Sequence, residues 1–240
     1  MKPRLYLRKL ICRLGYDIHR VPVDSLTLRD LEFDLPVLVD NRRPVVLDVG
    51  ANKGQTIDLI HRAFARPSIF SFEPNPELFS ALVAKYEARG VVVECFALGN
   101  REGSIGFHIA ENSELSSVLA LHRTDESPFS KTNERRVIVP ITTLDTWVKN
   151  RGLRHVDLLK VDAQGFDLEV LRGASTLLGH RGVKTLLVEV NFISLYEDQC
   201  SFGEVERFLK VKGYGLVALY ELARKNLQIG WATACFQPRE

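Results

Sequence analysis

The stretch VVLDVGANKGQT, from Val45 to Thr56, decides the fold class. A run of aliphatic residues ends in an aspartate and a glycine, and a helical pattern begins directly after a second glycine. A strand, a tight turn and a helix in this order begin a unit of a parallel sheet, and ligands bind outside the carboxyl ends of such strands. Gly50 lets the backbone take a positive φ, and Gly54, which lacks a Cβ, lets a ligand approach the helix. We therefore expect this turn to bind a ligand.

The rest of the chain continues the alternation of strands and helices. Strand patterns occur at 45–50, 68–73, 91–99, 103–110, 135–144, 156–165, 183–191, 214–222 and 230–237, and helical patterns at 55–65, 76–89, 167–178 and 203–213. Strands separated by helices indicate right-handed crossovers in a parallel sheet, and the last two strands are expected to form an antiparallel pair. The pattern predicts one doubly wound α/β domain over 45–240, preceded by a lead-in segment over 1–44. Residues 111–134 are polar and aperiodic, which is typical of a lid or binding loop.

Composition fits a single soluble domain with an unusual beginning. The chain has 240 residues, of which 45% are hydrophobic and 26% charged. Six basic residues and one acidic residue fall within the first twenty, so the main body carries a slight negative charge and is not expected to bind nucleic acid. Apolar residues recur at helical spacing between the basic ones from Leu7 to Leu14. This basic helix either contacts an anionic membrane surface or packs on the domain.

The cysteines indicate a reducing compartment. Cys12, Cys95, Cys200 and Cys235 are scattered and lack metal-binding spacing, so no metal site is expected. Cys95 and Cys235 lie in apolar strand patterns, which predicts buried free thiols. The sequence shows no secretory signal and no run of about 18 apolar residues. We therefore expect a cytoplasmic protein.

Three ligand classes compete for the first turn. A phosphate-binding P-loop needs GxxxxGK[ST], whereas GANKGQT has three residues between its glycines and Gln55 in place of the lysine. The GxGxxG pattern of NAD-dependent oxidoreductases would need glycines where Asn52 and Gln55 stand. The remaining pattern is DxGxxxG, with Glu73 at the end of the second strand, where a carboxylate binds ribose hydroxyls. An acidic residue near a cationic amino group and another near a ribose suit S-adenosylmethionine.

The motifs VLDVGANKGQT, SFEPNPELFSAL, ALGNREG, ITTLDTW, LLKVDAQGFDLEVLRGA and LLVEVN resemble, in order and spacing, those of the FkbM family of S-adenosylmethionine-dependent methyltransferases. The resemblance covers about four-fifths of the chain. It implies a class I methyltransferase fold, Rossmann-like, with a seven-stranded sheet whose last strand is antiparallel. It also implies O-methylation of a hydroxyl on a sugar, glycolipid or polyketide-type small molecule. The alternative is a non-catalytic S-adenosylmethionine-binding module or scaffold that keeps the fold.

The same resemblance assigns cofactor-binding residues. The cofactor loop matches at Asp48, Gly50, Ala51, Asn52 and Gly54, the ribose-binding acid at Glu73, the adenine-binding segment at Ala97 and Leu98, and the acid that faces the methyl group at Asp162. The chain departs from the family pattern at Gln164, where many members carry an acidic residue. A role for a second carboxylate at that position therefore does not transfer.

Catalytic roles are assigned at the ends of two later strands. Asp162 is the first candidate for the base that accepts the hydroxyl proton, and its alternative is a structural acid. Glu189 either orients the acceptor or braces a loop. Ser116 and Ser117 are candidates for substrate or cofactor contacts, His122 is a weaker candidate base in the loop, and Asp145 is expected to cap or brace the helix after Thr142. The loop 111–134 is expected to form the acceptor pocket, and the aliphatic carboxyl-terminal strand would allow a homodimer.

Overall fold

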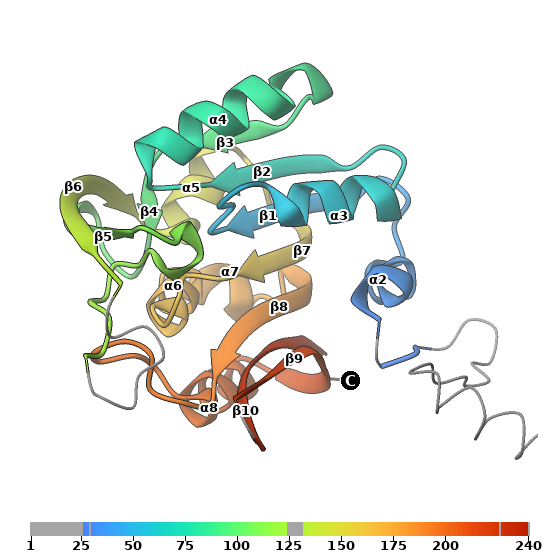
Figure 1. Cartoon of the computed structure of the whole chain (residues 1–240). Coiled ribbons are helices and arrows are strands. Elements are labelled where there is room, and N and C mark those ends of the chain that lie inside the picture. The colour runs from blue at the N-terminus through green and yellow to red at the C-terminus, as the bar shows by residue number, and fades with distance from the viewer. Residues whose placement is uncertain (1–25, 29, 124–131, 226, 240) are drawn as a thin grey trace, which may run out of the picture.

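A computed structural model describes residues 26–28, 30–123, 132–225 and 227–239 (Figure 1). The predicted basic helix, Cys12 and residues 124–131 of the predicted loop lie outside the described residues. The described chain forms three layers, in which helices cover both faces of a central sheet. This is the doubly wound arrangement predicted from the sequence.

The central sheet has seven strands in the order β3-β2-β1-β7-β8-β10-β9. Their bounds are β1 Val45–Val49, β2 Ser68–Phe72, β3 Val92–Glu94, β7 Val156–Val161, β8 Val183–Asn191, β9 Tyr214–Lys225 and β10 Gln228–Pro238. Neighbouring strands are parallel from β3 to β8, and β10 is antiparallel to β8 and β9. The predicted antiparallel last strand is therefore confirmed. The strand order reverses between β1 and β7, whose carboxyl ends lie side by side where ligands bind.

The two faces of the sheet are covered by different helices. One face carries α2 Leu31–Val39, α3 Gln55–Ala63 and α4 Pro76–Tyr86, and the other carries α5 Leu144–Asn150, α6 Asp167–Arg172, α7 Ser175–Gly179 and α8 Phe202–Val211. Successive strand side chains point to opposite faces. Val46 and Leu158 accordingly pack with α2 and α3, whereas Leu47 and Leu159 pack with the helices of the other face.

Helix α2 was not predicted, because it lies in the segment interpreted as a lead-in. Pro36 argues against a helix in the sequence, since proline removes a backbone hydrogen bond. The helix forms because Asp30 caps it, with its side chain accepting the Phe33 N–H, and because Leu35 and Leu38 are buried in the core beside the sheet. Its capped start lies beside the cavity described below, so residues 30–32 contribute to the site.

A second sheet lies beside the carboxyl ends of the parallel strands (Figure 1). It contains β4 Ala97–Leu98, β5 Gly103–Ala110 and β6 Glu134–Thr142 in the order β4-β6-β5. The single strand predicted over 91–99 is therefore two strands in different sheets. The chain leaves the central sheet after Glu94, whose carbonyl accepts the Glu73 N–H, and then pairs with β6.

The helix predicted over 167–178 is also two helices, α6 and α7. Asp145, which was expected to cap or brace α5, instead accepts the N–H groups of Thr176 and Leu177 in the first turn of α7, at 2.7 and 2.9 Å. The cap of α5 is Thr143, whose side chain accepts the Thr146 N–H. Because the cap of α7 lies about thirty residues earlier in the chain, local sequence patterns give no sign of the break.

Two of the cysteines were predicted to be buried free thiols. Cys235 is a buried free thiol, whereas Cys95 is only half-buried. Strand β9 is an edge strand, and the homodimer and the cytoplasmic location stay predictions. Within the described ranges no helix has the length and apolar character needed to cross a membrane.

Candidate functional site

A cavity of about 700 Å³ lies at the carboxyl ends of the parallel strands. Its walls come from the turn after β1, the segment between β3 and β5, the short helix Ser113–Leu115, the starts of α2 and α3, and the ends of β7 to β10. Of the predicted cofactor residues, the cavity brings together Gly50, Ala51, Asn52, Glu73, Ala97, Leu98 and Asp162. The cavity is large enough to bury a cofactor-sized ligand.

The two glycines of the first turn have different roles. Gly50 has a φ of +80°, and a Cβ there would lie 1.9 Å from the Asp162 carbonyl oxygen. The turn after β1 therefore packs directly on the loop that carries Asp162. Gly54 has a φ of +87°, and its Cβ would lie 2.4 Å from the ring of Tyr86. Gly54 does not line the cavity. Position 54 therefore requires a glycine because of its packing against Tyr86, and not because a ligand approaches it.

Glu73 is held by the backbone of the first turn. Its carboxylate accepts the Asn52 N–H at 2.8 Å and the Asn75 N–H at 2.9 Å. The side chain lines the cavity and is 4% exposed. Burial raises the pKa of Glu73 to about 7, although the two backbone hydrogen bonds oppose the rise. Glu73 is thus a rigidly positioned hydrogen-bond acceptor in the wall.

Asp48 lies behind the cavity wall and not in it. It is fully buried, and its Oδ2 accepts the Ser71 hydroxyl at 3.2 Å. Burial raises the pKa of Asp48, and the nearby Lys160 opposes the rise. The sequence analysis assigned this acid to a cationic amino group of the ligand. In the structure the cation facing Asp48 is the Lys160 ammonium, 3.9 Å away.

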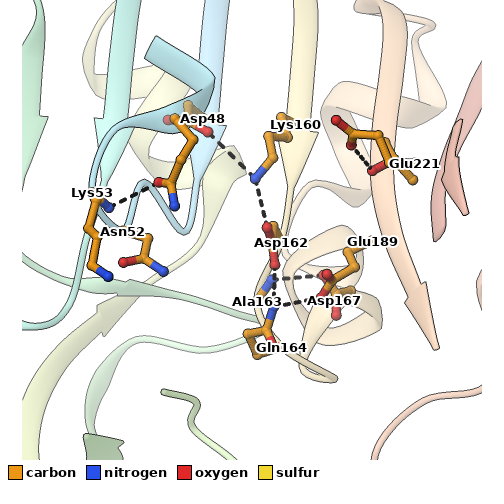
Figure 2. A network of polar contacts seen from close by, with 12 residues as sticks. Asp48, Asn52, Lys53, Lys160, Asp162, Ala163, Gln164, Asp167, Glu189 and Glu221 are labelled. Carbon is orange, nitrogen blue, oxygen red and sulfur yellow. Dashed lines mark hydrogen bonds and ion pairs between the residues drawn. The ribbon is translucent and has the colours of Figure 1, made fainter. Parts of the chain in front are cut away.

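Lys160 is a functional candidate that the sequence analysis missed. It sits in β7 opposite Asp48, and its Nζ lies 3.0 Å from Asp162 Oδ2 (Figure 2). Burial alone would lower the pKa of Lys160, but the charges of Asp162 and Asp48 outweigh burial and raise it. The available signal was a single cation in a strand that is otherwise apolar except for Asp157, because an unpaired lysine is rarely buried.

Gln164 joins the two predicted catalytic acids. Its Nε2 lies 2.7 Å from Asp162 Oδ1 and 2.7 Å from Glu189 Oε2 (Figure 2). Burial favours a raised pKa at Asp162, but the charge and hydrogen bond of Lys160 hold the pKa of Asp162 below its ordinary value. Burial and the charge of Asp162 raise the pKa of Glu189 well above its ordinary value. The pKa values of the two acids are therefore displaced in opposite directions, and Asp162 is the stronger acid of the pair.

Several groups fix the turn that carries Gln164, which has a φ of +52°. Asp167 accepts the N–H groups of Ala163 and Gly165, at 2.8 and 2.9 Å, and burial raises the pKa of Asp167 to about 7. The Tyr196 hydroxyl donates to Gln164 Oε1 at 2.6 Å. An amide that donates to two carboxylates and accepts from a phenol explains why glutamine fits where an acid is common.

Of the remaining candidates from the loop, one lies in the cavity wall and another supports the turn behind it. Ser116 lines the cavity. Ser117 is buried and donates to the Gln164 carbonyl at 2.8 Å, so it supports the turn and does not face the cavity. His122 does not line the cavity. In the described part of the chain no group of three or more histidine, cysteine, aspartate or glutamate side chains could hold a metal ion.

The wall opposite the first turn comes from the last three strands of the sheet. It contains Glu189 and Asn191 of β8, Trp231 and Thr233 of β10, and Glu221 of β9. Apart from Glu189, the sequence analysis missed these residues. Their common place becomes visible only when the pairing of β8 with β10 is known.

Residues 48–216 match the sequence profile of the methyltransferase FkbM domain. The chain belongs to the FkbM methyltransferase family. It is 26% identical over 191 residues to 2-O-methyltransferase NoeI of Sinorhizobium fredii, with 75% of each chain covered. It is 27% identical over 149 residues to hexuronic acid methyltransferase AglP of Haloferax volcanii, which covers 61% of this chain and 56% of that protein. The METTL16 methyltransferase domain shares the fold, with a TM-score of 0.51, 12% identity, and coverage of 97% of this chain and 79% of that chain.

This FkbM-family chain is therefore an S-adenosylmethionine-dependent methyltransferase of the class I fold. A hydrogen-bond acceptor and an apolar wall in its cavity suit that cofactor. Glu73 offers a fixed carboxylate at the end of β2, where ribose hydroxyls are bound in related sheets. Phe96, Ala97 and Leu98 form an apolar wall beside it.

Proposed function

We propose that this methyltransferase O-methylates a hydroxyl of a sugar, glycolipid or polyketide-type small molecule. The observation that carries the proposal is the Asp162 carboxyl group on the cavity wall, paired with Lys160 at 3.0 Å and linked through Gln164 to Glu189. A hydroxyl acceptor needs such a group, because its proton must leave during methyl transfer. The name of the relative NoeI, a 2-O-methyltransferase, gives independent support.

The cofactor residues have distinct proposed roles. Gly50, Ala51 and Asn52 line the part of the cavity that holds the amino-acid end of the cofactor, and Glu73 accepts hydrogen bonds from the ribose. Ala97 and Leu98 contact the adenine. Asp48 and Gly54 support this loop from behind, Asp48 through Lys160 and Gly54 through its contact with Tyr86.

When bound, S-adenosylmethionine supplies a methyl group on a positively charged sulfur. The acceptor oxygen forms a C–O bond to the methyl carbon while the C–S bond breaks and its electron pair goes to sulfur. Asp162 accepts the hydroxyl proton. Its lowered pKa does not prevent this step, because an oxygen that has gained a methyl group is strongly acidic. Alignment of the reacting atoms supplies roughly 7–11 kcal/mol, and a positioned base about 10²–10⁴ in rate.

Glu189 has the complementary proposed role. Its raised pKa favours the protonated form of the carboxyl, which can donate a hydrogen bond to the acceptor or to Asp162. A donor beside an ionised acceptor can orient a hydroxyl group through both its lone pair and its proton. Glu189 is thus proposed to orient the acceptor.

The test compares Asp162→Asn with the wild-type protein, using methyl-labelled S-adenosylmethionine and sugar and polyketide acceptors. We expect an alkali-stable methyl ether from the wild type, a fall in kcat of about 10²-fold or more in the variant, and nearly unchanged cofactor affinity by calorimetry. Asp198→Asn, at an exposed position outside the cavity, is the matched control.

Each other outcome has a definite meaning. Equal losses of kcat and cofactor affinity would assign Asp162 to cofactor binding. A methyl ester or a methylated amine as the main product would overturn O-methylation. Cofactor binding without S-adenosylhomocysteine formation on any hydroxylated acceptor would favour the non-catalytic module.

A further inference from the structure

The cavity wall formed by Glu189, Asn191, Glu221, Trp231 and Thr233 is here called the acceptor wall. We propose that it binds a sugar ring that is uncharged or carries an amine, and that it rejects sugars bearing a carboxylate or phosphate. The inference rests on the proposed function and names its substrate class.

The pairing of β8 with β10 places the acceptor wall on one face of the sheet. Glu189 is opposite Thr233, and Asn191 is opposite Trp231. Residues two apart on a strand point to the same side, so these four side chains form a compact square at the carboxyl end of β8. The square adjoins Asp162, because Gln164 bridges Asp162 to Glu189. A ring lying on it would present a hydroxyl to the proposed base.

A backbone irregularity adds a carboxylate to this square. The register of β9 and β10 shifts between Trp231 and Thr233, and Glu221 takes a φ of +52° at the bulge. Bulges re-aim side chains, and a left-handed glutamate is strained. The consequence is that the Glu221 carboxylate turns toward the cavity and accepts the Thr233 hydroxyl at 2.8 Å (Figure 2).

Asn191 supplies the independent sign of a ligand. The residue is 6% exposed and lines the cavity, and its Oδ1 has no hydrogen-bond partner among the described residues. A buried polar atom without a partner costs about 1–3 kcal/mol, so a ligand that satisfies it gains affinity. A sugar hydroxyl can do so, since it both donates and accepts. The half-buried Trp231 beside it offers an aromatic face to the C–H groups of a ring.

The charges of the cavity determine which sugars fit. Among the described residues that line it, the cations are Lys160 and Arg62, and both are already paired. Lys160 contacts Asp162, and Arg62 forms three hydrogen bonds with the Glu32 carboxylate. An acceptor carboxylate or phosphate at the acceptor wall would lie beside Glu189 and Glu221 with no free cation to neutralise it. Holding an anion there without a cation is unfavourable even though the Glu221 side chain is exposed to solvent, whereas a hydroxyl or an ammonium can donate a hydrogen bond to these acids.

The experiment measures binding to the protein loaded with S-adenosylhomocysteine, by calorimetry at pH 6.5. The probes are 4-nitrophenyl glycosides of glucose and galactose, each as the neutral hexoside, the 2-amino sugar and the uronic acid. We expect the neutral and amino glycosides to bind at least tenfold more tightly than the uronides. Equal or tighter binding of a uronide, or no binding by any probe, would overturn the proposal.

Variants assign the selectivity to the acceptor wall. We expect Glu221→Gln to reduce the preference for the amino glycoside over the uronide at least threefold, and the exposed Glu87→Gln to leave it unchanged. Asn191→Asp should weaken the neutral glycoside about tenfold, with the exposed Asn150→Asp as control. Trp231→Phe should weaken the binding of every glycoside less than Trp231→Ala does, and neither variant should change the affinity for the cofactor. Unchanged selectivity in Glu221→Gln together with unchanged affinity in Asn191→Asp would refute the assignment.

Binding and turnover fail separately in this design. If the expected glycosides bind but no methyl ether forms from them, the acceptor-wall proposal stands and O-methylation fails. If a methyl ether forms with equal efficiency on a uronide and its neutral counterpart, O-methylation stands and the selectivity is wrong.

Discussion

Lys160 Nζ lies 3.0 Å from Oδ2 of Asp162, two residues further along the chain. Lys160 is the second-last residue of β7 and pairs with Asp48 of β1, and Asp162 begins the loop that follows β7 at the cavity. The pair therefore connects a fully buried acid to an acid on the cavity wall. Its state of charge is central to the first two predictions.

Replacing Lys160 should destabilise the protein more than a surface charge change. Lys160→Met leaves Asp48 and Asp162 without their cation, and we expect a loss of about 3–5 kcal/mol in the free energy of unfolding. Adding Asp48→Asn should recover part of the loss, because one uncompensated charge is removed. Urea denaturation of the two variants measures both effects. Lys184→Met, which breaks an exposed pair with Asp40, should change stability by less than about 1 kcal/mol. A double variant no more stable than Lys160→Met would contradict this account.

The glutamine at position 164 should set the pH dependence of turnover. Gln164→Glu adds a carboxylate within hydrogen-bond distance of Asp162 and Glu189, and like charges raise the pKa of both acids. Asp162 then ionises at higher pH, so the acidic limb of kcat/KM should move upward by about one pH unit or more. Gln164→Met removes the amide without adding charge and should shift that limb less. If the acidic limb of kcat/KM stayed at the same pH in Gln164→Glu, that limb would not report the ionisation of Asp162.

Glu73 should govern cofactor affinity. Glu73→Gln keeps the shape of the side chain but removes the charged acceptor of the proposed ribose hydrogen bonds. By calorimetry at a pH above the Glu73 pKa of about 7, where the carboxylate is charged, we expect S-adenosylmethionine to bind about 1.5–3 kcal/mol more weakly, since hydrogen bonds to charged groups are worth that much. The exposed Glu77→Gln, four residues later, is the control. Unchanged affinity would remove Glu73 from the cofactor site.

Two glycines with similar backbone angles allow a matched test of the first turn. Gly50 has a φ of +80° and a close neighbour in the Asp162 carbonyl, whereas Gly90 has a φ of +76° and a Cβ added there would meet nothing within 4 Å. Gly90→Ala should therefore cost only the left-handed backbone penalty of about 1–2 kcal/mol. Gly50→Ala should cost clearly more in urea denaturation and should also weaken cofactor binding. Equal costs would show that the contact with Asp162 is readily relieved.

Asp167 should make stability decline as the pH rises. Its pKa is raised from 3.8 to about 7 in the folded protein, so the folded state holds the proton more tightly than the unfolded state. The resulting contribution to stability is present below about pH 4 and is lost as the pH rises toward 7. Asp167→Asn cannot titrate, and the unfolding free energy of wild type minus variant should fall over this interval. A difference that rises with pH would give the pKa shift the opposite sign.

Residue patterns alone, without the family resemblance, predicted those site residues that are close together in the chain. Gly50 and Asn52 follow one strand directly and Glu73 follows the next, so a single βαβ unit places all three at the cavity. Lys160 and Asn191 were missed because their places at the cavity depend on how β7 and β8 pair with other strands, and sheet register is not readable from local patterns.

The errors in the fold have the same origin. Helix α2 depends on burial against the sheet despite Pro36, and the separate start of α7 depends on a cap from Asp145. Both are tertiary effects that override local propensity. The seven-stranded sheet with an antiparallel last strand, by contrast, was implied by the family resemblance, and the repeated strand and helix signals of the sequence agree with it.

Helix α2 also constrains when the protein can finish folding. Asp34 in this helix accepts the Tyr220 hydroxyl, and the Leu38 carbonyl accepts from Thr185 and Gln237. These partners leave the ribosome long after the helix does, because synthesis proceeds from the amino terminus. During translation Leu35 and Leu38 therefore lack the later strands that bury them in the folded protein, and contacts between residues so far apart in the chain form slowly. The complete packing of α2 therefore requires β8, β9 and β10, the last three strands of the chain that the structure describes.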